Sequence, residues 1–187
     1  AIEEVEAQSE GHIKINCVPD GTMGGEDELI PQVFAGTLDM SLSGPSVWGT
    51  VGGIDEIGWS ELPYVVTNYS EMNALGEILP ELTNKQLEEK GIDLYCLGAM
   101  SHGIRCLLTT EGHKVETMAD CDGLRIRVPS SDVYQETVAA WGCSPTAMSS
   151  SQVITSLANG TIEGFESDPA SITARGQQES FKYYIET

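Results

Sequence analysis

The sequence predicts an α/β protein with mixed, mainly parallel sheets, and three observations lead to this prediction. Short apolar runs of strand character alternate with longer runs of helical character along the chain. Such alternation is typical of strands joined by helical crossovers, which place neighbouring strands parallel. The 187 residues are 40% hydrophobic, which is enough to form a core in one large domain or two small ones.

The first half of the chain is expected to hold three strands and two helices. Residues 12–18 alternate apolar and polar side chains between Gly11 and Pro19, which is the pattern of a half-buried strand. A glycine after each helical run indicates where that helix ends. The expected elements are a strand at 12–18, a turn at 19–25, a helix at 26–35, a strand at 37–43, an irregular aromatic-bearing stretch at 44–63, a helix at 71–90 and a strand at 92–97.

The second half repeats the same rhythm. Leu124, Ile126 and Val128 alternate with two arginines, so that the apolar side chains share one face of a strand. Gly142 and Asn159-Gly160 indicate the ends of two helices. The expected strands cover residues 104–108, 124–129, 161–165 and 181–185, and the expected helices cover residues 131–141 and 149–158.

The charge of the chain excludes several classes of partner. Nine Lys and Arg residues stand against 29 Asp and Glu residues, which gives a formal net charge of −20. Such an acidic surface repels nucleic-acid phosphates and anionic lipid headgroups. The apolar runs are only a few residues long, far short of the roughly 20 residues that cross a bilayer. We therefore expect neither nucleic-acid binding nor direct membrane insertion.

The two ends and the cysteines bear on processing and compartment. Residues 1–7 have the character of the middle of an acidic amphipathic helix, and residues 181–185 that of a strand cut off from its partner, so we expect a fragment of a longer protein. The five cysteines have no CxxC or zinc-like spacing, and burial as small hydrophobes is the simplest interpretation. A disulfide involving Cys121 or Cys143 stays an open alternative, and the cysteines do not indicate the compartment.

Arginines in strand-like segments are the unusual chemical feature of this acidic chain. A buried guanidinium is costly unless it is paired, and its planar fork is well suited to gripping a carboxylate. Arg127 stands at the carboxyl end of a strand, just before Pro129, where open α/β sheets bind ligands. Arg125 is expected to be solvated on an edge strand or held in a structural ion pair.

Catalytic and metal-binding patterns are weak in this sequence. Among the three histidines, only His102 follows an apolar strand in a place where a cleft is expected, and no GxSxG elbow accompanies it. Glu163, Glu166 and Asp168 could act as a base or a metal ligand, but solvated or ion-paired carboxylates are the simpler interpretation on an acidic chain. We therefore expect no catalytic residues, no metal and no cofactor.

The order of several motifs resembles the DctP-type solute-binding proteins of tripartite ATP-independent periplasmic (TRAP) transporters. The blocks that carry the resemblance are Gly11-His-Ile-Lys-Ile, Pro19-Asp-Gly-Thr-Met-Gly-Gly25, Gln32-Val-Phe-Ala-Gly-Thr-Leu-Asp-Met40, Glu61-Leu-Pro-Tyr64, Gly103-Ile-Arg105, Asp122-Gly-Leu-Arg-Ile-Arg-Val-Pro129, Gly142-Cys-Ser-Pro-Thr-Ala-Met148 and Ile162-Glu-Gly-Phe-Glu166. The resemblance implies a two-lobe periplasmic-binding-protein-like fold that closes on a small organic acid and delivers it to membrane permease subunits. It also implies that the first strand and the C-terminal part of the family fold are not in this chain.

The same resemblance assigns site residues. Arg127 matches the arginine that pairs with the ligand carboxylate, and Arg105 matches a second pocket cation, whereas Arg125 matches a position outside the pocket. Ser167 or Asp168 stands where many members have an amide that contacts the ligand. Ser150 lies in a segment that often carries an aromatic residue, and His102 completes the expected lining. Together with the small side chains at 149–152, Trp48, Trp59 and Tyr64 would permit a bulkier or aromatic acid, unless the tryptophans simply cover the core.

The resemblance further implies how the chain is divided and where it works. We expect a first lobe at residues 1–102, a second lobe at 103–187 and a hinge near residues 102 and 186. The expected location is the periplasm or the extracellular face of the cytoplasmic membrane, with soluble and lipid-anchored forms both open. The alternative function is an enzyme on the same scaffold that uses His102 or Glu166 as its base, and a third is a structural or sensory module.

Overall fold

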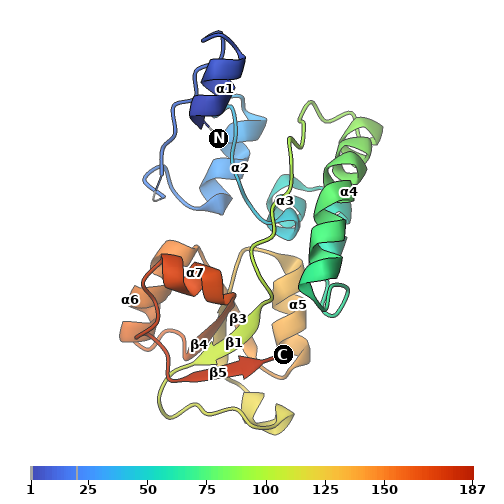
Figure 1. The fold of residues 1–187 in the computed structure, drawn as a ribbon. Coiled ribbons are helices and arrows are strands. Elements are labelled where there is room, and N and C mark those ends of the chain that lie inside the picture. The colour runs from blue at the N-terminus through green and yellow to red at the C-terminus, as the bar shows by residue number, and fades with distance from the viewer. Residues whose placement is uncertain (1, 20) are drawn as a thin grey trace.

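The computed structural model describes residues 2–19 and 21–187, and it places all of the described strands in the second half of the chain. Helices make up the first part: α1 (Ile2–Gln8), α2 (Glu26–Phe34), α3 (Pro45–Gly52), the 3-10 helix η1 (Asp55–Glu61) and α4 (Tyr69–Glu89). The second part contains β1 (Cys106–Thr109), η2 (Met118–Cys121), β2 (Arg125–Val128), α5 (Asp132–Ala140), β3 (Ser144–Ala147), η3 (Ser150–Gln152), α6 (Val153–Ala158), β4 (Gly164–Ser167), α7 (Pro169–Ala174) and β5 (Tyr183–Glu186). Figure 1 shows the helical part above the sheet.

The described residues form one five-stranded mixed sheet in the order β3-β2-β4-β1-β5. Strand β2 runs parallel to β3 and β4, whereas β1 runs antiparallel to β4 and β5. The mixed α/β class predicted from the sequence is confirmed, although parallel pairing is less dominant than expected. Strand β5 pairs with β1 along its whole length, from Cys106↔Glu186 to Thr109↔Tyr183. The prediction that this last segment lacks its partner is therefore wrong.

Helices cover both faces of this sheet, and its inner strands β4 and β1 are completely buried. All four residues of β1 are buried, and Leu107 faces the opposite side from Cys106 and Leu108. On one face, Leu107 joins a cluster with Tyr134 and Val138 of α5. The other face belongs to a second cluster that contains residues of α6 and α7, and Figure 1 shows α5 and α6 on opposite sides of the strands. Each fully buried aliphatic side chain stabilises such a core by about 1.5–3 kcal/mol.

A glycine allows β4 to approach β1 closely. Gly164 pairs with Thr109, and a Cβ atom at Gly164 would lie 2.3 Å from the carbonyl oxygen of Leu108. Strand β4 begins at this glycine, three residues later than the predicted strand at 161–165. The sequence pattern missed this shift because the apolar run already begins at Ile162, which packs in the core without entering the ladder.

The stretch predicted to be irregular, residues 44–63, is in fact mostly helical. Pro45 occupies the first turn of α3, where its missing N–H costs nothing, and Gly53 ends the helix with a φ of +70°. Helix η1 follows directly, and Ile54, Ile57 and Leu87 of α4 form a small core there. Glycine and proline therefore mark the two ends of a short helix in this stretch rather than a loop.

Three predicted strands are not formed in the described part of the chain, at residues 12–18, 37–43 and 92–97. These segments make no strand ladder, residues 37–39 form a bend, and large apolar side chains such as Ile13, Leu42 and Leu97 are exposed. A strand is stable only when a neighbour pairs with its backbone, and no described segment does so here. The predicted turn at 19–25 includes Asp20, which lies outside the described residues.

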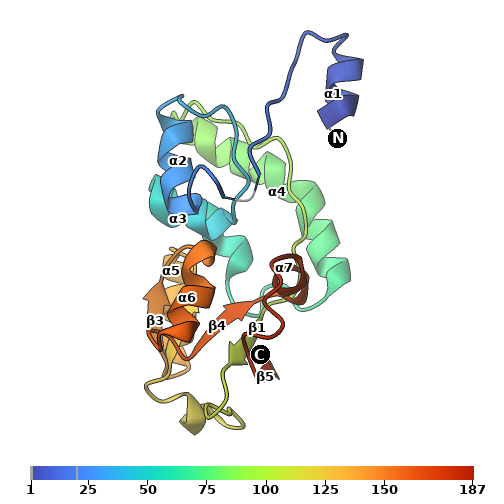
Figure 2. The same cartoon turned by 90° about the vertical axis from the view of Figure 1, so that its left-hand side faces the viewer.

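The helices agree better with the sequence pattern. The helix predicted at the start of the chain is α1, whose described residues are not buried and which Figure 2 shows standing apart from the rest. Helix α4 begins after Asn68, whose side chain accepts a hydrogen bond from the backbone N–H of Glu71. The helix predicted at 149–158 begins as η3 and continues as α6. Among the residues described, no helix combines the length and apolarity that crossing a bilayer requires.

Candidate functional site

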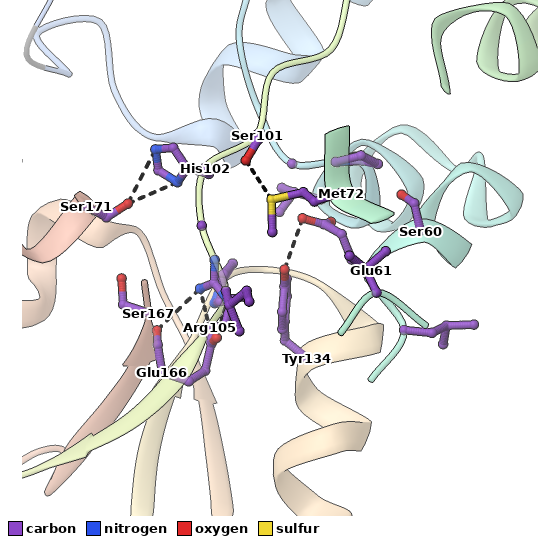
Figure 3. Close-up of a pocket in the computed structure, with 18 of the residues that line it drawn as sticks. Ser60, Glu61, Met72, Ser101, His102, Arg105, Tyr134, Glu166, Ser167 and Ser171 are labelled. Carbon is purple, nitrogen blue, oxygen red and sulfur yellow. Dashed lines mark hydrogen bonds and ion pairs between the residues drawn. The ribbon is translucent and has the colours of Figure 1, made fainter. Parts of the chain in front are cut away.

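A cavity of about 560 Å³ lies between the helical part and the sheet. Its walls come from α2, α3, η1 and α4 on one side and from the segment 99–105, β2, α5, η3, β4 and α7 on the other. Five of the residues predicted for the site line this cavity: His102, Arg105, Arg127, Ser150 and Ser167. Figure 3 shows how Arg105, Glu166, Tyr134 and Glu61 lie around it.

Arg127 is the buried cation of this cavity. It is 4% exposed, and its Nε and Nη2 atoms donate to the backbone carbonyl of Met148 at 3.0 and 2.7 Å. No carboxylate oxygen in the described part of the chain lies within 4.0 Å of its guanidinium. Burial lowers the pKa of Arg127 to about 10, with Glu166 opposing the shift and Arg105 adding to it. The group is therefore still charged at neutral pH and still open to an anionic partner.

Arg105, in contrast, already has a protein partner. Its Nε and Nη2 atoms bind the two carboxylate oxygens of Glu166, with an Nη2–Oε1 distance of 2.7 Å, and Glu166 is 3% exposed. The guanidinium carbon lies 4.6 Å from the centre of the Tyr134 ring, within the range of a cation–π contact. Burial alone would lower the pKa of Arg105, but the charge of Glu166 outweighs it and the pKa is raised. The pair is a fixed, neutral unit at the edge of the cavity.

Three further charged residues line the cavity, although the sequence analysis did not predict them for the site: Glu26, Glu61 and Arg175. Glu61 accepts hydrogen bonds from the Tyr134 hydroxyl at 3.0 Å and from the backbone N–H of Ser46 at 2.7 Å. Burial raises the pKa of Glu26, although Arg127 and Arg175 oppose the shift. The arginines among the described lining residues, 105, 127 and 175, are thus matched by three glutamates, 26, 61 and 166. The sequence signal for Glu61 was its place at the head of the Glu61-Leu-Pro-Tyr64 block.

His102 and Asp168 meet where β4 passes into α7. The Nδ1 atom of His102 lies 3.1 Å from Oδ2 of Asp168, and Ser171 lies within hydrogen-bond distance of both. The Ser171 hydroxyl donates to Asp168 at 2.6 Å, so it does not present a free nucleophile to the cavity. Asp168 is 1% exposed. Gly103 packs closely against it, because a Cβ atom added at Gly103 would lie 3.1 Å from the Cβ of Asp168. Asp168 therefore connects the segment around His102 to α7 through these contacts. It is not among the described residues that line the cavity.

We expect Asp168→Ala to lower the free energy of unfolding by about 1–2 kcal/mol at neutral pH, because the side chain caps α7 through the N–H of Ser171 at 2.9 Å. Burial alone would raise the pKa of Asp168, but the hydrogen bonds from Ser171 outweigh it and hold the pKa below its ordinary value of 3.8. A lowered folded-state pKa stabilises the fold above pH 3.8, and this contribution disappears as the pH falls through the folded-state value. Urea unfolding of both proteins at several pH values measures the difference. Asp168→Asn keeps the cap, so its free energy of unfolding should fall less than that of Asp168→Ala. The prediction would be contradicted if the difference in unfolding free energy between the unsubstituted protein and Asp168→Ala stayed constant below pH 3.8.

Three further residues from the sequence analysis have clear positions. Ser167 is buried on β4 at the cavity wall, and Ser150 is half-buried at the start of η3. Trp48 packs with Phe34, at 5.9 Å between ring centres, and against the small core of the helical part. It is not among the described residues that line the cavity. The interpretation that Trp48 covers the core therefore fits its position.

Arg125 has the structural role that the sequence pattern favoured. Its Nη2 atom lies 2.9 Å from Oε1 of Glu163, and its guanidinium also donates to the carbonyl oxygens of Gly160 and Thr161. Glu163 is thus an ion-pair partner. Within residues 2–19 and 21–187, no group of three or more His, Cys, Asp and Glu side chains is arranged to hold a metal ion.

The start of α5 connects the sheet part to the helical part. Ser130 donates to Oδ2 of Asp27 at 2.6 Å, and the backbone N–H of Asp132 donates to the Thr50 hydroxyl at 3.0 Å. The Tyr134 hydroxyl adds the bond to Glu61 described above. The two walls of the cavity are thus held together by a segment that follows Arg127 directly in the chain.

Comparison with known proteins provides a family match over almost the whole chain. Residues 2–187 match the DctP model, described as bacterial extracellular solute-binding protein, family 7. A solute-binding protein of Roseobacter denitrificans is 31% identical over 189 residues, which cover 99% of this chain and 55% of the relative. The chain therefore spans about half the length of the curated relatives it matches.

Solved structures of TRAP periplasmic solute-binding proteins have the same fold. One from Chromohalobacter salexigens with bound D-glucuronate has a TM-score of 0.87 at 27% identity. The match covers 98% of this chain and 60% of the solved chain. One from Sulfitobacter sp. NAS-14.1 with bound β-D-galacturonate has a TM-score of 0.86 at 26% identity, with the same coverage. The α/β architecture found here is thus that of these binding proteins.

Proposed function

Since the chain belongs to the DctP family, family 7 of the bacterial extracellular solute-binding proteins, we propose that it captures a small organic acid and delivers it to the membrane subunits of a TRAP transporter. The family consists of binding proteins rather than enzymes, so the alternative of an enzyme with His102 or Glu166 as its base is withdrawn. The contacts of Glu166 agree with this, because its carboxylate is paired with Arg105.

The observation that carries the proposal is the buried guanidinium of Arg127. Burying a charge without a counter-charge is costly, and the described protein atoms offer it only the carbonyl of Met148. A ligand carboxylate supplies the missing charge and can accept two parallel N–H bonds from the fork. Arg105 contributes indirectly, because its pairing with Glu166 leaves Arg127 as the better anchor for an external acid.

A hydroxylated acid, such as a uronate or an aldonate, is the ligand class we propose. The cavity of about 560 Å³ has the size of a small-molecule site, and Glu26, Glu61 and Ser150 offer it hydrogen-bond acceptors for hydroxyl groups. The similar structures with bound D-glucuronate and β-D-galacturonate support this class. The alternative of an aromatic acid loses the support of Trp48, which packs against Phe34, although Tyr64 does line the cavity.

The location and the division into lobes complete the proposal. A protein with this task works in the periplasm or on the outer face of the cytoplasmic membrane. We propose residues 1–102 and 103–187 as the parts of two lobes that close over the acid, with bending near residues 102 and 186. The cavity supports these two bending points, because its described lining includes His102 and Gly103, between α4 and β1, and Thr187, next to β5.

A thermal-shift titration tests this function with a matched pair of ligands. D-Glucuronate and D-glucose differ at C6, where the former carries a carboxylate and the latter a hydroxymethyl group. At about 100 times its dissociation constant a ligand stabilises the folded state by about 2.7 kcal/mol, a rise of several degrees in Tm. We expect this rise with one or more of D-glucuronate, D-galacturonate and L-galactonate, and none with D-glucose. Equal shifts with D-glucose, or no shift with any carboxylate at millimolar concentration, would contradict the proposal.

A further inference from the structure

Two cysteines lie together in the core beneath the Arg127 strand. Cys121, at the end of η2, is 3% exposed, and Cys143, just before β3, is 6% exposed. Both belong to the cluster formed with Leu107, Ile126 and Val138. Their side chains therefore share one apolar compartment although 22 positions separate them in the chain.

The backbones beside the two cysteines are in direct contact. The N–H of Gly123 donates to the carbonyl of Gly142 at 2.9 Å, and an added Cβ at Gly142 would lie 3.9 Å from the Cα of Asp122. The parallel register of β2 and β3 pairs Arg125 with Ser144, and one step back it brings Leu124 beside Cys143. Burial and the adjacent thiol of Cys121 raise the pKa of Cys143 to about 12. Neighbouring backbones and a shared apolar compartment favour a disulfide, because such a bond forms only between cysteines whose Cα atoms lie within about 7 Å.

The other cysteines have different surroundings. Cys106 belongs to the cluster on the opposite face of the sheet, where its thiol donates to the carbonyl of Ser167 at 3.0 Å. Cys17 is exposed, and Cys96 is half-buried with its thiol 3.6 Å from the carbonyl of Gly98. Cys121 and Cys143 are thus the pair that the fold selects among the five thiols.

We propose that Cys121 and Cys143 form a disulfide bond that closes a covalent loop around β2 and α5. In the reaction, the thiolate of one cysteine attacks a disulfide of a small-molecule or protein oxidant and forms a mixed disulfide. The second thiolate then displaces the remaining thiol, so that two S–H bonds are lost, one S–S bond is formed and the oxidant is reduced to two thiols. Because both side chains are shielded in the folded chain, the bond forms before the core closes and then resists reduction.

The loop encloses residues that matter for the site. It contains Arg127 and Tyr134, and the crosslink would connect the segment just before β2 to the segment just after α5. Neither cysteine is among the described residues that line the cavity. In the cell, the bond depends on the extracytoplasmic location proposed above, because such compartments are oxidising. In the test tube it depends only on the fold, so its formation can be judged separately from ligand binding.

Peptide mapping of the refolded protein tests the crosslink. The protein is refolded from denaturant in a buffer of oxidised and reduced glutathione, alkylated in guanidinium without reductant, digested and analysed by mass spectrometry. We expect one linked peptide pair that contains Cys121 and Cys143, with the other three of the five cysteines alkylated. Reductant added in native buffer should leave the bond intact for hours, whereas reductant in guanidinium should break it. Alkylation of all five cysteines, or a link between any other pair, would overturn the proposal.

Matched variants separate the crosslink from general effects of losing a thiol. Cys106→Ala removes an equally buried thiol and should keep the linked peptide, whereas Cys143→Ala should abolish it. The oxidised protein should melt several degrees above its reduced form, and the double variant Cys121→Val/Cys143→Ala should melt at one temperature under both conditions. Equal melting of the oxidised and reduced forms of the unsubstituted protein would contradict the proposal even if a variant fails to fold.

Discussion

Replacing Arg127 by methionine should weaken binding of a carboxylate ligand by about 2–5 kcal/mol, which is roughly 30-fold to several thousand-fold in affinity. The reason is that the ligand carboxylate loses the charge that compensates its removal from water inside the cavity. The fold should not suffer, because Arg127 contacts no carboxylate in the described part of the chain and buried charges are often replaced by apolar side chains without loss of stability. The Tm of the ligand-free variant should therefore equal or exceed that of the unsubstituted protein.

Isothermal titration with the acid that gives the largest thermal shift measures this effect. Arg125→Met is the matched control, since Arg125 precedes Arg127 by two positions on β2 but pairs with Glu163 away from the cavity. It should bind the acid with nearly unchanged affinity. If the two variants lose affinity equally, or if Arg127→Met binds normally, Arg127 is not the anchor of the ligand.

The second large effect concerns stability rather than binding. Glu166→Gln should lower the free energy of unfolding by about 3 kcal/mol, because it leaves the guanidinium of Arg105 without its counter-charge. The value is at the lower end of the range for buried pairs, since the Arg105 side chain is 29% exposed and water can solvate it in part. Urea denaturation at neutral pH measures this change.

Glu163→Gln provides the matched control for this stability prediction. Glu163 pairs with Arg125, whose side chain is 47% exposed, so the loss should stay below about 1 kcal/mol. The double variant Arg105→Met/Glu166→Leu removes both charges and should recover most of the stability lost in Glu166→Gln. Equal losses in Glu166→Gln and Glu163→Gln would show that the buried pair has no special weight.

The sheet part of the fold was predictable from the sequence because its signals are local. The alternation around Ile126 identifies β2, and Gly142 identifies the end of α5. Each predicted strand there finds a partner within the same 80 or so residues, from Cys106 to Glu186. The strands predicted at 12–18, 37–43 and 92–97 have equally good patterns but no described partner. Periodicity indicates which residues could form a strand, whereas pairing decides whether they do.

The residues of the candidate site also differ in whether a local sequence signal or long-range folding places them there. Arg127 could be proposed from the sequence, because its place at the end of a strand and its match to the family motif are both readable there. Glu26 and Glu61 could not, because only the folding of α2 and η1 against the sheet brings them to the cavity. The pairing of Arg105 with Glu166 joins positions 61 residues apart and follows from the antiparallel contact of β1 and β4. Long-range pairing thus determines which charge is free to meet a ligand.

The segment from Ser130 to Tyr134 has a consequence for how the cavity opens. Its bonds to Asp27, Thr50 and Glu61 fall within five consecutive residues, which run from just before α5 into its first turn. A movement large enough to part the two walls must therefore break these contacts nearly together, and two of them end on carboxylates, where a hydrogen bond contributes about 1.5–3 kcal/mol. Separation of this kind has a threshold, so the walls are expected to populate two discrete arrangements rather than a continuous range of widths.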